Sequence, residues 1–160
     1  MTEQKIGLGG GCHWCTEAVF QSLTGVTKVE QGWIASEGSE KNFPEAAIVE
    51  FNPAISLQTL LEIHLLTHSS TANHSFRNKY RSAIYYEDTV QKLAVEKAFL
   101  EAKFILDENP ITKILPLSDF RLNEEAFLNY YQKRPDAPFC QTYISPKLAM
   151  RRKRYTKQIK

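Results

Sequence analysis

The stretch GLGGGCHWCTEAVF, from Gly7 to Phe20, decides the start of the fold, because a strand has to end and a helix has to begin inside it. The apolar letters of KIGL are typical of a short strand, and the three consecutive glycines that follow favour a sharp turn. The letters CTEAVFQSLTG then place apolar residues at helical spacing and stop at Gly25. Cys12 and Cys15 are thus predicted to lie one helical turn apart at the start of a helix.

Apolar residues at the spacing of strands and at the spacing of helices recur along the rest of the chain. We expect strands at 26–35, 45–53, 81–87 and 111–120, and helices at 56–68, 88–106 and 123–135. Ser56 and Asp88 are predicted to cap the first two of these helices, and Pro116 marks the last strand as an edge or a bulge. Interspersed strands and helices favour a two-layer domain of the α/β or α+β class.

Length and composition favour a single domain over residues 1–160, since a chain of 160 residues can bury a core of its own. Hydrophobic residues make up 42% and charged residues 24%, an ordinary balance for a soluble protein. No apolar run approaches the roughly 20 residues of a membrane span, and MTEQKIGL lacks the features of a secretory signal. We therefore expect a cytoplasmic protein whose three cysteines do not form a disulfide scaffold.

The segment 146–160 is basic, with seven Lys and Arg residues and no acid, whereas the rest of the chain holds 13 basic and 18 acidic residues. A solvated terminal helix or tail accounts for such a segment. A nucleic-acid-binding arm is disfavoured, because the body carries the opposite charge and aromatic residues are not interleaved with the basic ones.

A phosphate cradle is one interpretation of the glycines. Gly7 and Gly9 have the spacing of a dinucleotide fingerprint, and Glu30 follows at about the right distance. Cys12, however, occupies the position of the third glycine, so the pattern is incomplete.

A structural zinc site is a second interpretation. Cys12 and Cys15 form a CxxC pair, and His64 and His68 lie four residues apart on one predicted helix, which together would supply four ligands. The long separation of the two pairs disfavours this interpretation, and His64 in an apolar stretch is also typical of a buried core histidine.

A nucleophilic or redox thiol is the third interpretation and explains most of the stretch. At the first turn of a helix, unpaired backbone N–H groups and the helix dipole stabilise a thiolate at Cys12. The glycines before it would permit a sharp turn and the close approach of a substrate. Cys15 is within reach of a disulfide with Cys12, or it packs in the core.

The sequence around these cysteines resembles the A class of peptide methionine sulfoxide reductases. GGGCHWCTEAVFQSLTGV is similar to that family's start, with its GCFW signature, and FPEAAIVEFNP to its GHAEAVxVxYDP segment. LLEIHLLTHSST resembles its helix ending in HDPT, and KYRSAIYY its QYRSAIYY. NYYQKRPDAPFCQTYISPKLA resembles its C-terminal HQxYLxKNP…YC segment, so the matches run in family order from Gly9 to about Ala149.

The resemblance implies an α+β domain, a two-layer sandwich with a mixed sheet, that reduces the S epimer of methionine sulfoxide, free or in peptides. The resemblance also implies that no metal or cofactor is bound and that thioredoxin is the reductant. We expect a monomer that has neither nucleic acid nor membrane among its partners. A thiol–disulfide protein of the same fold without sulfoxide specificity stays open as the alternative.

By motif position, Cys12 would be the nucleophile that attacks the sulfoxide sulfur and becomes a sulfenic acid. Glu45 would protonate the sulfoxide oxygen, and Tyr80 would donate a hydrogen bond to it. A sulfoxide oxygen is a poor leaving group until it is protonated, so a carboxyl group with a raised pKa in a partly apolar site would suit this chemistry. Cys140 would then resolve the sulfenic acid, with Cys15 as a competing or second thiol.

The substrate pocket is where the chain departs from the family pattern. Trp14 would line the pocket for the methyl group, while His13 replaces the Phe of GCFW and Trp33 stands where the family has a Tyr. Ser75, in TANHSFRN, stands in place of a family Asp. These changes predict weaker activity or a preference for another sulfoxide.

Overall fold

The computed structural model describes residues 3–38, 42–68, 70, 79–138, 140 and 144–160. The strands are β1 (Gln4–Gly9), β2 (Val26–Ala35), β3 (Glu45–Phe51), β4 (Ala83–Tyr86), β5 (Lys113–Pro116) and β6 (Asp119–Leu122). The α-helices are α1 (His13–Gln21), α2 (Leu57–Thr67), α3 (Thr89–Ala102), α4 (Tyr130–Lys133) and α5 (Ser145–Arg154). Short 3₁₀ turns are η3 (Lys103–Ile105), η4 (Glu125–Phe127) and η6 (Thr156–Gln158).

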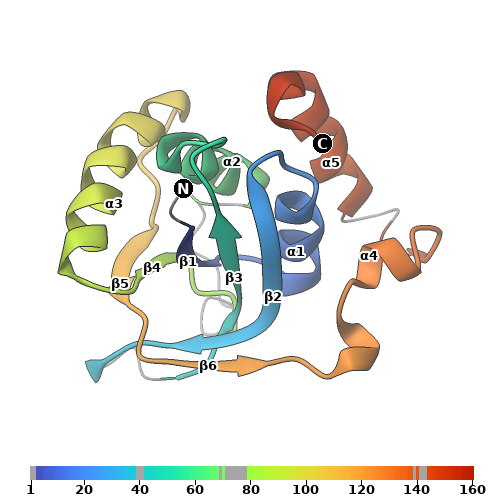
Figure 1. Cartoon of the computed structure of the whole chain (residues 1–160), viewed down its shortest axis with the longest axis horizontal. Coiled ribbons are helices and arrows are strands. Elements are labelled where there is room, and N and C mark those ends of the chain that lie inside the picture. The colour runs from blue at the N-terminus through green and yellow to red at the C-terminus, as the bar shows by residue number, and fades with distance from the viewer. Residues whose placement is uncertain (1–2, 39–41, 69, 71–78, 139, 141–143) are drawn as a thin grey trace.

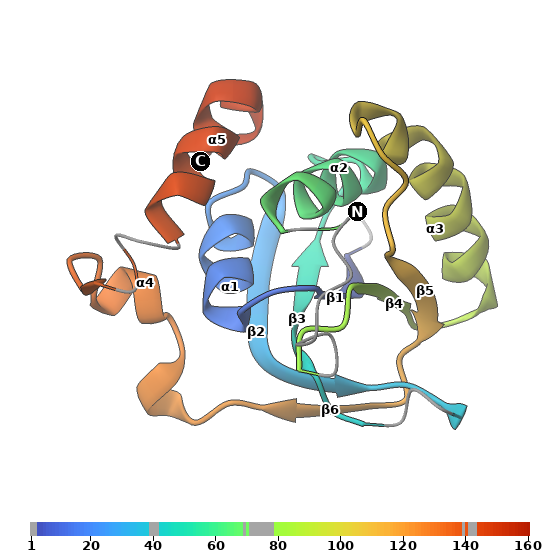
Figure 2. The ribbon, with the colours of Figure 1, turned by 180° about the vertical axis from the view of Figure 1, so that it is seen from behind.

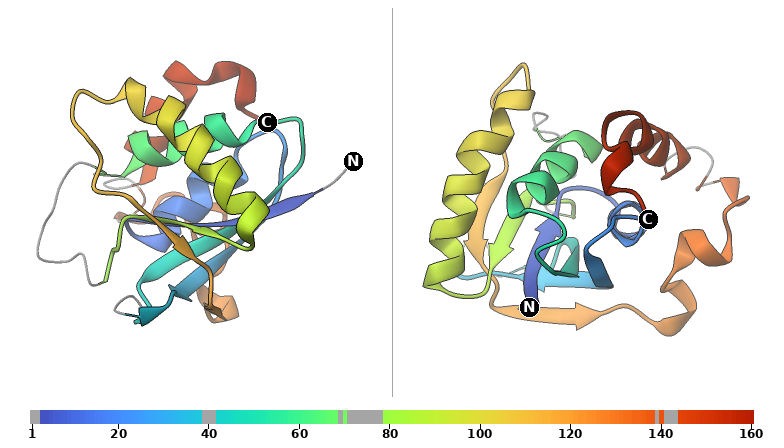
Figure 3. Two further views of the ribbon diagram at one scale, coloured as in Figure 1. Left: turned by 90° about the vertical axis from the view of Figure 1, so that its left-hand side faces the viewer. Right: turned by 45° about the horizontal axis from the view of Figure 1, so that its top comes forward.

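The strands of the described residues form one six-stranded sheet in the order β5-β4-β1-β3-β2-β6. Neighbours are antiparallel except β4 and β5, which are parallel and joined through α3. The helices gather on one face of this sheet, with α3, α2 and α1 side by side across it (Figures 1 and 2). The two layers are clearest when the sheet is seen from its edge (Figure 3). The expected α+β sandwich with a mixed sheet is confirmed.

The main core lies between the sheet and these helices. Alternate residues of a strand point to opposite faces, and the central strands are apolar on both. Ile6 and Leu8 of β1 and Ile84 of β4 face the helices, whereas Ala83 and Tyr85 belong to a smaller cluster on the other face. Such two-sided burial makes the centre of the sheet a rigid base for the residues that follow β1.

The predicted helix starts are confirmed at both capped helices. The Ser56 hydroxyl accepts a hydrogen bond from the backbone N–H of Thr59 at 3.1 Å. The Asp88 carboxylate likewise accepts one from the backbone N–H of Gln91 at 2.8 Å. Each side chain satisfies a donor that the first turn of its helix leaves unpaired.

Two predicted elements are wrong in extent. The expected strand at 111–120 is divided into β5 and β6, which pair with strands at opposite edges of the sheet, so no single strand could hold both positions. Pro116 ends β5, an edge strand, as predicted. The expected helix at 123–135 is also divided, because Asn129 adopts a left-handed conformation (φ 56°) between η4 and α4.

The basic C-terminal segment is anchored at its end. Tyr155 is buried and donates a hydrogen bond to the Glu62 carboxylate at 2.9 Å. Ile159 forms a β-bridge with Leu23, and the N–H of Lys160 donates to the Ser22 carbonyl at 3.0 Å. The expected terminal helix is present as α5, but the residues from Tyr155 onward pack at the far end of α1 and are not the solvated segment that was predicted. In the described part of the chain, no helix is both long and apolar enough to cross a bilayer.

Candidate active site

Cys12 lies at the junction between β1 and α1, where it forms the N-cap of the helix with extended backbone angles (φ −60°, ψ 130°). Its carbonyl accepts the N–H groups of Cys15 and Thr16, so the first turn is regular, and its thiol is half-buried. The sharp strand-to-helix turn is confirmed. At Gly10 (φ 153°), an added Cβ would lie 2.4 Å from a ring carbon of His68. The backbone angle alone restricts this position to glycine, and the His68 ring leaves no space for a Cβ there.

The environment of Cys12 favours its thiolate. Its pKa is lowered, chiefly because the Cys15 thiol donates a hydrogen bond to the sulfur, with backbone N–H groups of Trp14 and Cys15 adding to the effect. Burial and the negative charge of Glu45 oppose this shift without reversing it. The pKa of Cys15 is raised well above the ordinary thiol value, because its proton is engaged by Cys12 and its surroundings are buried. Of the two thiols, Cys12 is thus the one whose surroundings favour the thiolate, with Cys15 as its hydrogen-bond donor.

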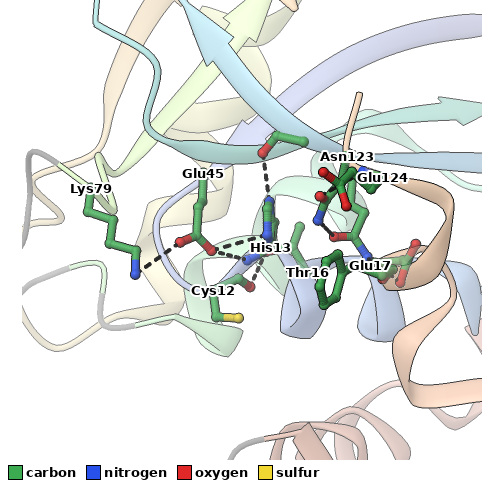
Figure 4. Close-up of polar contacts among 11 residues, drawn as sticks. Cys12, His13, Thr16, Glu17, Glu45, Lys79, Asn123 and Glu124 are labelled. Atoms are coloured by element: carbon green, nitrogen blue, oxygen red, sulfur yellow. Dashed lines mark hydrogen bonds and ion pairs between the residues drawn. The ribbon is translucent and has the colours of Figure 1, made fainter. Parts of the chain in front are cut away.

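Glu45 opens β3 and lies beside Cys12 with its carboxyl group buried (Figure 4). One carboxylate oxygen, Oε1, accepts the backbone N–H of His13 at 3.2 Å and lies 3.4 Å from His13 Nε2. The other, Oε2, lies 3.4 Å from the ammonium group of Lys79. The expected partly apolar setting is therefore a polar one, with donors on both oxygens.

Strand register brings these residues together. Trp33 of β2 stands directly opposite Glu45 of β3, so both side chains share one face of the sheet. The N–H of Glu45 also donates to the carbonyl of Lys79 at 2.8 Å, which ties the segment before β4 to the site. Tyr80 follows half-buried, with the Lys79 ammonium 5.1 Å from its ring centre. The structure thus gathers Cys12, Glu45 and the neighbourhood of Tyr80 at one place.

An aromatic hollow of about 750 Å³ opens next to this group. Trp14 stacks on Tyr130 at 4.1 Å between ring centres and on Phe127 at 5.9 Å. Trp33 meets the His13 ring edge-on at 5.1 Å. The residues that line the hollow are His13, Trp14, Trp33, Phe43, Arg121, Leu122, Asn123, Glu124 and Phe127. The three predicted substrate-binding residues therefore share one wall.

A buried carboxylate that the sequence analysis missed, Glu17, fastens the start of α4 next to the hollow. It accepts hydrogen bonds from the side chain of Gln31 at 2.8 Å and from the backbone N–H groups of Asn129 and Tyr130 at 2.9 and 3.2 Å. Burial raises its pKa despite these donors. Glu17 thereby holds Tyr130 against Trp14. An acid on the apolar face of a predicted helix is the signal that could have identified it.

The remaining cysteines are buried close to Cys12. Cys15 and Cys140 both belong to the main hydrophobic cluster, and Cys12 packs against it. The pKa of the Cys140 thiol is raised by burial and, to a smaller extent, by the charge of Cys12. Cys140 therefore does not project into solvent but lies in the core, near enough to Cys12 for the charge of Cys12 to act on it. Ser75, the last predicted departure, lies outside the described residues.

The geometry does not favour the zinc interpretation. His64 Nε2 donates to the Gly9 carbonyl at 2.9 Å, and His68 Nε2 is hydrogen-bonded to the Ser82 hydroxyl at 2.8 Å. Within the ranges that the structure describes, no three His, Cys, Asp or Glu side chains are placed to share a metal ion. The two histidines instead pack against the glycine turn that precedes Cys12.

The phosphate interpretation fails at its first glycine. A Cβ at Gly7 would lie 2.7 Å from Ile34 and 2.8 Å from Tyr85. Gly7 is thus a packing position inside the sheet and is not part of a loop that faces a ligand.

A low-pKa thiol at a helix start, beside a buried carboxylate and an aromatic hollow, defines a thiol-dependent enzyme. The family model for peptide methionine sulfoxide reductase matches residues 4–159. The peptide methionine sulfoxide reductase MsrA of Psychrobacter sp. (strain PRwf-1) is 32% identical over 169 residues, covering 95% of this chain and 96% of that one. The chain therefore belongs to the peptide methionine sulfoxide reductase family.

Solved structures share the fold. Mxr1 from Saccharomyces cerevisiae in its reduced form superimposes with a TM-score of 0.73 at 22% identity, covering 88% of this chain and 91% of that one. Mxr1 in complex with Trx2 gives a TM-score of 0.60 at 22% identity, with 77% and 82% of the two chains covered.

Proposed function

We propose that this protein reduces the S epimer of methionine sulfoxide, free or in peptides, with Cys12 as the nucleophile. The observation that carries the proposal is the lowered pKa of Cys12 next to the Glu45 carboxyl group. The thiolate attacks the sulfoxide sulfur, and the oxygen takes one proton and leaves as hydroxide. Attack of hydroxide on the Cys12 sulfur then breaks the new S–S bond and gives methionine and a Cys12 sulfenic acid. The cysteine sulfur loses the two electrons that the sulfoxide sulfur gains.

Glu45 is the proposed source of that proton, and Tyr80 the proposed hydrogen-bond donor to the same oxygen. Oxygen leaves sulfur only as hydroxide or water, so an acid within reach of the reacting atoms lowers the barrier. Trp14, Trp33 and His13 line the hollow in which the methyl group and side chain of the substrate would lie.

Turnover requires a second thiol. Condensation of the sulfenic acid with a neighbouring thiol releases water and forms a disulfide, which an external dithiol then reduces. We propose Cys140 as the resolving residue, because its buried thiol belongs to the cluster against which Cys12 packs and lies within range of the Cys12 charge, with Cys15 as a later relay. Thioredoxin is the proposed reductant, in keeping with the Mxr1 complex with Trx2.

The setting of the reaction is also a proposal. We propose a cytoplasmic monomer that works without nucleic acid, membrane or metal. One family model matches residues 4–159, which supports treating the chain as a single domain with a basic C-terminal segment at 146–160.

A single-turnover assay with the two resolved sulfoxide epimers tests the function. The reduced protein should convert only the S epimer, and Cys12→Ser should abolish conversion even without recycling. Glu45→Gln should lose roughly 10²–10⁴-fold in rate. Reduction of a model disulfide without reduction of either epimer would favour the thiol–disulfide alternative.

Peptide mapping after one equivalent of sulfoxide and alkylation tests the resolving step. We expect a Cys12–Cys140 disulfide. A lone Cys12–Cys15 bridge, together with normal turnover of Cys140→Ser under thioredoxin, would make Cys15 the resolving residue.

A further inference from the structure

His13 is held in one tautomer by the sheet. Its side chain is buried, and Nδ1 lies 2.7 Å from the carbonyl oxygen of Gly32 on β2. A carbonyl oxygen only accepts, so Nδ1 must carry a hydrogen in every protonation state in which this bond exists. In neutral His13 the other nitrogen, Nε2, is consequently a bare acceptor.

That bare nitrogen faces a carboxyl group. Nε2 lies 3.4 Å from Glu45 Oε1, the oxygen that also accepts the backbone N–H of the same histidine (Figure 4). At 3.4 Å the two atoms form an ion-pair contact that is longer than an ordinary hydrogen bond. A lone pair close to a carboxylate is repulsive, and a proton between the two atoms relieves that repulsion. Such contacts are often long in resting enzymes and shorten when substrate binds.

We propose that His13 is a positioning residue that holds one proton jointly with Glu45, between Nε2 and Oε1, and so keeps that proton available for transfer to the substrate. The inference rests on the proposed reductase function for its catalytic meaning, but not for the shared proton itself. Loss of the proton to the sulfoxide oxygen leaves the bare Nε2 against a carboxylate, an arrangement that favours uptake of the next proton.

The surrounding charges act on this proton in both directions. Among the described residues, the titratable and charged groups near His13 are Glu45 on β3, Lys79 before β4, the adjacent Cys12, and Arg121 and Glu124, which line the same hollow. Burial lowers the pKa of His13, with the charge of Glu45 acting in the opposite direction and that of Lys79 in the same one. Burial outweighs the charge of Glu45, so the ring does not hold a full positive charge of its own, and the shared proton is inferred from the position of Nε2 next to Oε1.

Two measurements test the inference, and the first does not need activity. Ring ¹⁵N NMR of the reduced protein, with His13 assigned through its contact with Trp33, should show a protonated Nδ1 and a partly protonated Nε2 near neutral pH. In Glu45→Gln the Nε2 signal should become that of a bare nitrogen, and protonation of the ring should require at least about tenfold more acid. An Nε2 signal that is equally bare in both proteins would overturn the proposal.

The second measurement is the pH profile of single-turnover methionine formation. His13→Gln keeps a polar group in the site, but an amide is not a base, so the alkaline limb should move about one pH unit lower. In a Glu45→Gln background the same change should not move the profile further. An alkaline limb at the wild-type pH in His13→Gln would overturn the proposal. A wild-type protein that reduces no sulfoxide would instead refute the proposed function, leaving the NMR result to decide on the shared proton.

Discussion

Mild acid should destabilise this protein in a pH range set by His64. The imidazole is fully buried, donates to the Gly9 carbonyl, and stacks obliquely on His68 at 4.3 Å between ring centres. Burial lowers its pKa from 6.5 to about 4, because a charged ring would have no water around it. The unfolded chain binds the proton near pH 6.5, and the folded chain binds it only near pH 4.

The sign and size of the effect follow from that difference. Above pH 6.5 His64 is neutral in both states, and the free energy of unfolding does not depend on it. As the pH drops from 6.5 toward 4, the unfolded chain binds the proton first, so the free energy of unfolding falls; below that range both states bind it and the fall ends. At about 1.4 kcal/mol per pH unit, the total loss is about 3 kcal/mol. For a chain of this size that corresponds to roughly 6–12 °C in Tm.

Comparison with His64→Gln isolates this residue from every other titrating group. Urea unfolding of both proteins at several pH values between 7.5 and 4 gives the stability difference directly. Glutamine removes some packing and will be less stable at pH 7.5, but the gap should narrow by about 3 kcal/mol on going to pH 4. Two stability curves that stay parallel over this range would refute the reasoning, as would an NMR titration of His64 centred near pH 6.5.

Three further predictions concern the residues around Cys12. Cys15→Ala should raise the pKa of Cys12, because the S–H donor to its sulfur is lost. The pH dependence of iodoacetamide alkylation measures this pKa, and an unchanged midpoint would contradict the assignment of Cys15 as the donor. Gly10→Ala should cost about 1–3 kcal/mol in urea unfolding, because its φ of 153° strains a residue that has a Cβ and that Cβ would clash with His68. Gly11→Ala, whose Cβ meets His68 only at 3.8 Å and whose backbone carries no such strain, should cost clearly less. Glu17→Gln should cost about 1–3 kcal/mol, because its amide cannot accept every donor that the carboxylate accepts; equal stability and unaltered Trp14 fluorescence would argue against its anchoring role.

Local signals in the sequence predicted most of the regular structure. Apolar periodicity located the strands and helices of the first 100 residues, and Ser56 and Asp88 marked two helix starts. Both features depend on residues a few positions apart, which a sequence displays directly. The division of the 111–120 and 123–135 segments depends on pairing with distant strands and on one left-handed residue, Asn129, which periodicity does not encode.

The candidate site, too, could be predicted only where its signals come from residues close together in the sequence. The glycine turn identified Cys12, and family motifs pointed to Glu45, Tyr80 and Cys140. The contacts that give these residues their chemistry join positions far apart, such as His13 with Glu45 and Glu17 with Asn129. Local spacing therefore identified the thiol, but it could not identify the proton partner of the acid or the carboxylate that positions the pocket wall.

The attachment of the 123–130 segment through Glu17 has a consequence for engineering. Phe127 and Tyr130, which stack on Trp14, belong to a segment that is fastened to α1 by Glu17 and Gln21 and to β2 by Gln31, and that contributes no residue to the proton and thiol chemistry proposed here. Libraries that vary the aromatic content of this segment while retaining its three anchoring side chains should change which sulfoxides enter the hollow and leave the alkylation rate of Cys12 unchanged.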